Sequence, residues 1–215
     1  KEFNYSAINN FAVREARGEY LLFLNNDVEI ITESWLEEML QLCQQKDVGM
    51  AGAKLYYPDD TIQHAGVVVG LGGVAAHVLC KLPRDAEGYM GRLRCVQEIS
   101  AVTAACMMVK TSVFKAVGGF DEELKVAFND IDLCMKVRKY GVKIVFTPYA
   151  ELYHYESKSR GMEDTPEKQL RFSREVNCFR RKWERELLKG DPYYNPNLTL
   201  NNTDCSLRKQ EKNGD

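Results

Sequence analysis

Hydrophobic and polar positions alternate along the first sixty residues in a pattern that predicts helices separated by short strands. Residues 6–17 have helical spacing, with Ile8 and Phe11 on the face expected to be buried. Tyr20–Leu24 is continuously apolar, as is typical of a strand covered on both faces. A second helical pattern and a second apolar run follow, over 34–43 and 48–55. This alternation predicts an α/β layer built on a largely parallel sheet.

The pattern is less regular in the rest of the chain. Residues 72–95 show no clear period and are expected to form a loop. A long helix is expected to begin at Pro166 and to continue to Gly190. The chain is then rich in Asn and Pro before it becomes polar, so Asn201–Asp215 is expected to be a tail. We therefore divide it into one domain over 1–190 and an Asn/Pro-rich segment with a polar tail over 191–215.

Composition is that of a globular domain. The chain has 215 residues, and 45% of them are hydrophobic, which is enough for a core. Its net charge of −2 does not indicate the broad basic surface that binds nucleic acid. Seven cysteines without close pairing are typical of reduced thiols, which favours a cytoplasmic location. No apolar stretch approaches the roughly 20 residues of a membrane span. The chain does not begin with Met, and we expect it to be an excised part of a longer protein.

Two acidic signatures about a hundred residues apart are the candidates for chemistry. In the first, the apolar run ends in Asn25, Asn26 and Asp27. Ligand sites of open α/β sheets lie at the carboxyl ends of strands, and a carboxylate there would suit Mg²⁺ or Mn²⁺. The alternative is an ordinary turn after a strand, where Asn and Asp are common.

The second signature contains Asp130 and Asp132 at the start of a predicted helix that Gly141 ends. Asp130 is either the helix N-cap or a base that accepts a proton. His154 follows a strand-like run and is either a structural histidine or a ligand. His64 and His77 lack such a context, and we interpret both as structural or surface residues.

Taken together, these segments resemble family 2 glycosyltransferases of the GT-A fold, particularly bacterial enzymes of surface-polysaccharide assembly and rhamnosyltransferases. The resemblance runs from about Asn4 to Trp183. The segments that carry it are Asn9-Asn10, Ala16–Tyr20, Leu22–Asp27, Gly118–Glu122, Asn129–Cys134, Pro148–Ala150 and His154–Ser157.

The resemblance implies a GT-A-like, Rossmann-like mixed sheet with flanking helices, truncated at the N-terminus, and a long C-terminal helix. It implies that Asp130 is the catalytic base, and that Asp27 and His154 hold Mg²⁺ or Mn²⁺. The sequence departs from the family pattern at two positions, because Asn25 and Asn129 stand where many members carry acids.

Further site residues are expected around these three. Asn25, Asn26, Lys158 and Arg160 are assigned to the donor diphosphate, where cations would stabilise the leaving group. Asp132 and Thr103 are assigned to the acceptor side.

The expected function is inverting transfer of a sugar from a UDP- or dTDP-sugar to a saccharide or lipid-linked saccharide acceptor. The alternatives are a non-catalytic saccharide- or partner-binding module and a metal-dependent phosphoester hydrolase. Nothing matches the family's N-terminal nucleotide-binding half. We therefore expect an exposed strand edge at Tyr20–Leu24, either self-association through that side or its shielding by nearby loops, and no transfer by this chain alone. The basic residues of the last helix are interpreted as an ordinary exposed face, with peripheral membrane contact as the alternative.

Overall fold

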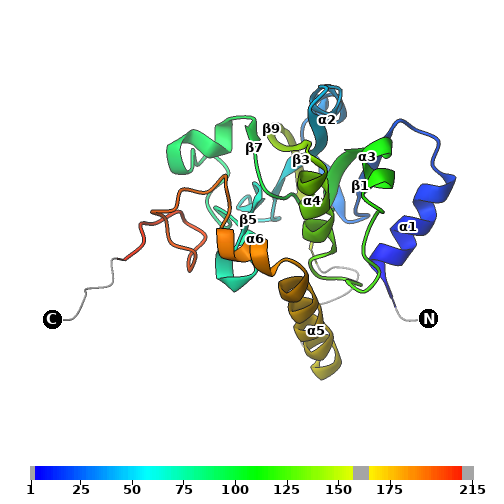
Figure 1. Ribbon diagram of the computed structural model, residues 1–215. Helices are drawn as coiled ribbons and strands as arrows, with labels where there is room; N and C mark the ends of the chain where they lie inside the picture. Colours follow the sequence, from blue (N-terminus) through cyan, green and yellow to red (C-terminus); the bar gives the residue numbers. More distant parts are fainter. Residues whose placement is uncertain (1–2, 157–164, 210–215) are drawn as a thin grey trace.

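The computed structural model describes residues 3–156 and 165–209 as a central sheet with helices on both faces (Figure 1). The helices are α1 (Tyr5–Glu15), α2 (Trp35–Cys43), α3 (Thr111–Ala116), α4 (Asn129–Tyr140), α5 (Pro166–Lys182) and α6 (Glu184–Lys189). The strands are β1 (Tyr20–Leu24), β2 (Val28–Ile30), β3 (Val48–Tyr56), β4 (Ile62–His64), β5 (Val67–Val69), β6 (Ala75–His77), β7 (Gln97–Glu98), β8 (Cys106–Lys110) and β9 (Lys143–His154).

The main sheet is mixed rather than largely parallel. Its strand order is β1-β8-β3-β9-β2, with β4 paired to β3 and β7 paired to β9, while β5 and β6 form a separate hairpin. Only β3 and β9 run parallel among the described strands of this sheet. Our expectation of a largely parallel sheet was wrong because a continuous apolar run reports that a strand is buried and says nothing of its direction.

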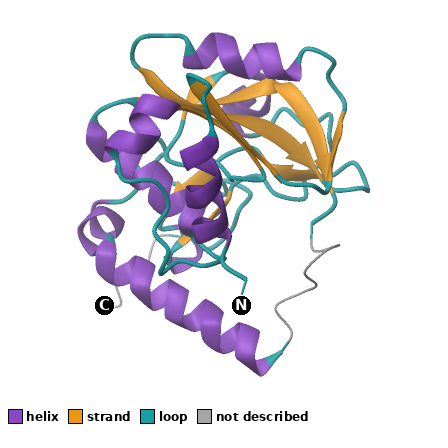
Figure 2. Ribbon diagram, turned by 90° about the vertical axis from the view of Figure 1, so that its right-hand side faces the viewer, coloured by secondary structure: helices purple, strands orange, loops and turns teal. Residues whose placement is uncertain are grey.

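The sheet lies between two hydrophobic clusters. On one face lies α2, whose Trp35 and Met39 belong to one cluster with Ala51 and Leu152. Figure 2 shows helices on both sides of the strands. On the other face the larger cluster joins the sheet to α3, α4 and the β5–β6 hairpin. Strand β3 is buried at all of its residues, as expected for a strand covered on both faces.

The apolar face of helix α1, which we predicted to be buried, is exposed in the structure. Ile8 and Phe11 are 54% and 64% exposed, and the helix instead buries Ser6 and Val13. The Ser6 hydroxyl donates to the Leu124 carbonyl at 2.5 Å. The Asn10 side chain pairs with both the N–H and the carbonyl of Phe120. The helix is therefore fastened to the 120–125 loop by hydrogen bonds, and its apolar stripe faces outward.

Strand β1 lies at the edge of the described sheet, as expected. It pairs with β8 and has no second neighbour among the described strands. Leu21 and Phe23 are buried, whereas Leu24 is 41% exposed, so the strand is less completely covered than its apolar run predicts. With Ile8 and Phe11, Leu24 adds apolar surface at this side. Self-association through it stays a prediction.

The irregular segments pack closely onto the body of the molecule. The expected loop over 72–95 contains strand β6, which was not predicted, and its Val78, Leu79 and Leu93 side chains are buried, so the segment is anchored in the core. The expected tail begins later than Asn201, because the Leu79 N–H donates to the Thr203 carbonyl and Cys205 is buried. The division of the chain at residue 190 stays a prediction.

The expected long C-terminal helix is divided in two. Trp183 separates α5 from α6, and α5 extends away from the rest of the molecule in Figure 1. Among the described residues no helix has both the length and the apolar character to cross a membrane.

Candidate active site

A cleft of about 610 Å³ opens where β1 and β9 end and the chain enters α4. It brings together Asp27, Asp130 and His154, which are far apart in the sequence. The expected convergence of these three residues is therefore confirmed, and their chemical roles stay proposals. Asn25, Asn26 and Thr103 line the same cleft.

Asp27 and His154 face each other across one end of this cleft. The Oδ1 atom of Asp27 lies 3.2 Å from Nε2 of His154, and the Asn25 amide nitrogen lies 3.1 Å from the same Nε2. The backbone supports the pair, because β2 follows directly after Asp27 and aligns Val28 with His154. The pairing of β2 with β9 therefore brings a strand end and a distant histidine together.

Gln63 determines which nitrogen of His154 carries the proton. Its Oε1 atom lies 2.7 Å from Nδ1 of His154, inside the protein. Because an amide oxygen only accepts, Nδ1 carries the hydrogen and Nε2 presents a lone pair to Asp27. Burial lowers the pKa of His154, against the opposing effect of the Asp27 and Glu156 charges, so the ring is neutral near pH 7. Sequence reasoning missed Gln63, a polar residue of the short strand β4 between Ile62 and His64.

The Asp27–His154 pair fits a divalent cation. Oδ1 of Asp27 is buried and has no hydrogen-bond donor among the described residues. It faces the lone pair of Nε2, so two electron-rich atoms point at each other, an arrangement that a cation would stabilise. No group of three or more His, Cys, Asp or Glu ligands exists in the described part of the chain. The protein would thus supply two ligands and leave the others to phosphate oxygens and water.

Asp130 lies on the other side of the cleft. Helix α4 begins after Phe128, and no side chain caps its first turn. One carboxylate oxygen of Asp130 accepts from the Ala104 N–H at 3.2 Å, and the other accepts from the Ile131 N–H at 2.8 Å. The alternative in which Asp130 is only the N-cap therefore does not match the structure. Its carboxylate instead lines the cleft.

Helix α5 holds the loop that precedes Asp130. The buried carboxylate of Glu175 accepts from the N–H groups of Val126 and Ala127 at 2.9 and 3.0 Å. Phe128 has a φ of 61°, which is unusual for a bulky residue. Its ring packs against those of Phe172 and Phe179. Sequence reasoning missed this role of Glu175, because one acidic residue in a charged helix gives no signal.

Asn129, the first residue of α4, is buried. Its side-chain amide donates to the Val126 carbonyl at 3.1 Å. The side chain that replaces the acid common at this position therefore closes a turn immediately before Asp130.

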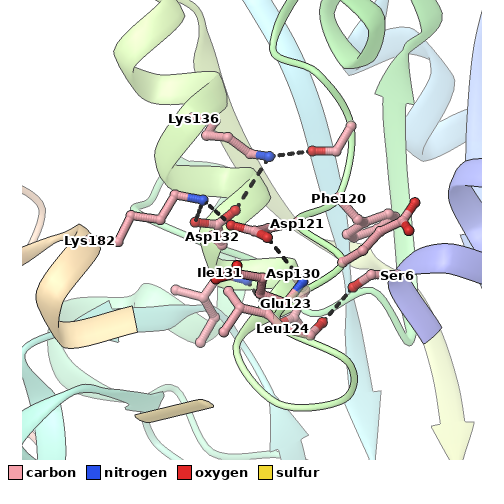
Figure 3. Close-up of polar contacts among 12 residues, drawn as sticks. Ser6, Phe120, Asp121, Glu123, Leu124, Asp130, Ile131, Asp132, Lys136 and Lys182 are labelled. Atoms are coloured by element: carbon pink, nitrogen blue, oxygen red, sulfur yellow. Dashed lines mark hydrogen bonds and ion pairs between the residues drawn. The ribbon is translucent and has the colours of Figure 1, made fainter. Parts of the chain in front are cut away.

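Asp132 lies outside the cleft, away from the acceptor side where we expected it. It is fully buried, accepts from the Trp183 indole N–H at 2.8 Å, and forms ion pairs with Lys136 and Lys182 at 3.3 and 2.8 Å. Figure 3 shows the two lysines converging on Asp132, with Lys182 also reaching Asp121. This network attaches the C-terminal helices to α4.

The remaining expected residues are distributed as follows. Thr103 lines the cleft, where its backbone N–H donates to Nε2 of His64 at 3.5 Å. Lys158 and Arg160 lie outside the described residues. His77 and Glu156 line the cleft although neither was predicted to do so.

Comparison with known proteins identifies a family to which the chain is similar, and individual proteins that share sequence or fold with it. Residues 2–175 match a family described as glycosyltransferase-like. An uncharacterized protein of Sinorhizobium fredii, y4gI, is 57% identical over 96% of this chain. The O-antigen biosynthesis protein RfbC of Myxococcus xanthus is 42% identical over 99% of it. The chain spans 23% and 16% of the lengths of these two relatives.

A solved structure shows which fold the chain shares. The crystal structure of GalNAc-T7 with UDP, GalNAc and Mn²⁺ superimposes with a TM-score of 0.61 at 12% identity, and covers 87% of this chain and 36% of that one. The shared architecture is the GT-A fold, a mixed α/β arrangement around a central sheet. The expectation of a GT-A-like mixed sheet is confirmed.

Proposed function

The chain belongs to the glycosyltransferase-like family, and from this premise we propose that it carries the reaction centre of an inverting, sugar-nucleotide-dependent transferase. The observation that carries the proposal is the convergence of Asp27, His154 and Asp130 on one cleft. A phosphoester hydrolase, which we considered from the sequence, lacks such family support. A non-catalytic module would not need the Asp27 carboxylate after β1, which has a buried oxygen without a hydrogen-bond donor among the described residues.

In the proposed reaction Asp130 is the base. Its carboxylate accepts the proton of an acceptor sugar hydroxyl as that oxygen attacks the anomeric carbon of the donor. The new glycosidic bond forms while the bond from the anomeric carbon to the diphosphate breaks, and the nucleoside diphosphate leaves with the electron pair. Because attack and departure occur on opposite faces, the anomeric configuration inverts. The two backbone N–H groups at Asp130 fix the direction of its oxygens.

Asp27 and His154 would hold Mg²⁺ or Mn²⁺, with Asn25 and Asn26 beside them. A divalent cation there supplies positive charge that offsets the charge developing on the departing diphosphate. The structurally similar GalNAc-T7 was solved with UDP and Mn²⁺, which supports a metal of this kind here. Gln63 would keep the His154 lone pair directed at the cation.

We place the reaction in polysaccharide biosynthesis, with a UDP- or dTDP-sugar as donor and a saccharide or lipid-linked saccharide as acceptor. The support is the 42% identity to an O-antigen biosynthesis protein of Myxococcus xanthus. Because the chain spans a small part of that relative, these assignments concern the whole protein that contains it.

The test uses the full-length protein with a panel of UDP-, dTDP- and GDP-sugars and methyl glycosides as acceptors. We expect metal-dependent transfer from a UDP- or dTDP-sugar, with a product whose anomeric configuration by NMR is opposite to that of the donor. Retention of configuration would contradict the role of Asp130. Absence of transfer to every acceptor, together with lack of donor hydrolysis, would contradict the enzymatic assignment itself.

A further inference from the structure

Two histidines form a buried pair beside the catalytic cleft. Nδ1 of His64 lies 2.8 Å from Nδ1 of His77, and their rings meet edge-to-face with centroids 4.9 Å apart. His64 is fully buried at the end of β4, while His77 is half-buried at the end of β6. Neither belongs to the metal pair or the base described above.

The hydrogen bonds around the pair determine both tautomers. The Thr103 backbone N–H donates to Nε2 of His64, so that nitrogen carries no proton and Nδ1 does. Nδ1 of His64 then donates to Nδ1 of His77, which places the proton of His77 on Nε2. Burial lowers the pKa of both histidines, which keeps the two rings neutral and the chain of donors intact.

The Nε2–H group of His77 is thereby available to the cleft. His77 lines the cleft together with Thr103 and Asp130. Asp130 and Glu156 line the same cleft, and their charges oppose the lowering of the His77 pKa by burial. Among the described residues Nε2 of His77 has no hydrogen-bond acceptor, whereas its Nδ1 is held by His64.

We propose that His77 binds the acceptor saccharide, by donating a hydrogen bond from Nε2 to a sugar oxygen beside the hydroxyl that Asp130 deprotonates, and that His64 fixes the tautomer required. The inference rests on the proposed transferase function. A neutral N–H donor suits an uncharged sugar hydroxyl or ring oxygen. His77 lines the same cleft as Asp130, the residue that must meet the acceptor, and its ring is held by His64.

The first test is the tautomer itself. The sequence has only three histidines, so the imidazole ¹⁵N spectrum of the ¹⁵N-histidine-labelled 215-residue chain contains three ring systems, which the single variants His64→Gln, His77→Gln and His154→Gln assign. We expect an Nε2–H signature for His77 and an Nδ1–H signature for His64 at pH 7.5. An Nδ1–H signature for His77 would overturn the proposal.

The second test separates ligand binding from a structural role. In Gln the amide nitrogen occupies about the position of Nε2, whereas in Asn it corresponds to Nδ1. In the full-length protein, with the methyl glycoside that the parent uses best, His77→Asn should raise the acceptor KM roughly three- to tenfold, the value of one neutral hydrogen bond. His77→Gln should keep the acceptor KM close to that of the parent. In both variants kcat and the donor KM should change less than about twofold.

Val69→Ala is the packing control in the same hairpin, since Val69 is buried and does not itself line the cleft. It should lower Tm without raising the acceptor KM. Equal effects of the Gln and Asn variants, or a change confined to the donor KM, would overturn the acceptor assignment. If the parent transfers no sugar, the proposed function fails, while the tautomer spectrum still decides whether His77 presents its donor.

Discussion

The two walls of the cleft are built by different means. The metal wall, made of Asp27, His154 and Gln63, rests on strand pairing, because the β2–β9 ladder brings Asp27 to His154 and Gln63 lies on β4, which pairs with β3. The base wall, made of residues 125–128 and the start of α4 with Asp130, rests on side-chain contacts from α5, chiefly those of Glu175. One wall is therefore an extension of the sheet, and the other depends on a helix that follows in the sequence.

The walls also differ in how many hydrogen bonds their carboxylates accept. Both oxygens of Asp130 accept backbone hydrogen bonds, so the group is stable without a ligand. Oδ1 of Asp27 is buried without a donor, and it faces a neutral histidine nitrogen. The metal wall is thus the electrostatically strained one, and a bound cation would relieve that strain.

The largest effect is expected at the base wall. Asp130→Asn should reduce the rate of sugar transfer by the full-length protein by roughly 10²-fold or more, because an amide does not accept the acceptor proton. The amide oxygen can still accept a backbone hydrogen bond, so Tm should change little. Steady-state kinetics and thermal unfolding measure both, and transfer at the parental rate would show that Asp130 is not the base.

The second-largest effect should come from the residue that orients His154. Gln63→Leu removes the acceptor for Nδ1–H, frees the tautomer, and should weaken Mn²⁺ binding by roughly 10- to 100-fold. Gln63→Glu retains an acceptor and is the matched control, with affinity equal to or above that of the parent. Calorimetric titration with Mn²⁺ compares the three proteins, and equal affinity in the Leu variant would exclude this role.

A smaller effect is expected where α5 holds the base wall. Glu175→Gln leaves one of the Val126 and Ala127 N–H groups facing an amide donor, which should lower the free energy of unfolding by about 1–3 kcal/mol. Sugar transfer should fall as the loop before Asp130 loosens, while Mn²⁺ affinity is retained.

The control for this helix is Glu167→Gln, an exposed residue in the first turn of α5. It should change stability by less than about 0.5 kcal/mol. A Glu175 variant that lost Mn²⁺ affinity together with transfer would mean that the two walls are not independent.

The smallest effect concerns pH and the histidine pair beside both walls. Burial lowers the pKa of His64 and of His77, so below their ordinary value near 6.5 the unfolded chain binds more protons than the folded one. Stability is therefore complete above about pH 6.5 and falls as the pH decreases from there toward the lowered values. The slope is at most about 1.4 kcal/mol per pH unit for each histidine.

Urea unfolding at pH 7.5 and 5.5 measures this loss. The double variant His64→Gln/His77→Gln, whose amides do not titrate, should show a smaller difference between the two pH values than the parent. An equal difference in both proteins would contradict the assignment of this pH dependence to the pair.

The sequence predicts the metal wall better than the base wall. His154 ends β9 and Asp27 follows shortly after β1, and a strand end is visible as an apolar run that stops in polar residues. Gln63 and Glu175 are single polar residues whose partners lie 91 and 49 residues away, so no local pattern reveals them. The same limit explains the error at α1, because an apolar stripe does not say which other segment covers it.

The expectation that Asp27, Asp130 and His154 meet rested on their places at the ends of predicted elements, and the resemblance to a glycosyltransferase family strengthened it. The resemblance gave no indication of the His64–His77 pair, which we had interpreted as structural or surface residues. Tertiary hydrogen bonds alone distinguish such a pair from two unrelated histidines.

The most direct test of the division between the walls is the Mn²⁺ affinity of Asp130→Asn measured beside that of Asp27→Asn. We expect Asp130→Asn to bind Mn²⁺ with an affinity within about threefold of that of the parent, although it has lost sugar transfer. Asp27→Asn should bind Mn²⁺ at least about tenfold more weakly than the parent, because the substitution removes a metal ligand. Loss of Mn²⁺ affinity in Asp130→Asn equal to that in Asp27→Asn would make Asp130 a metal ligand and contradict its assignment as the base.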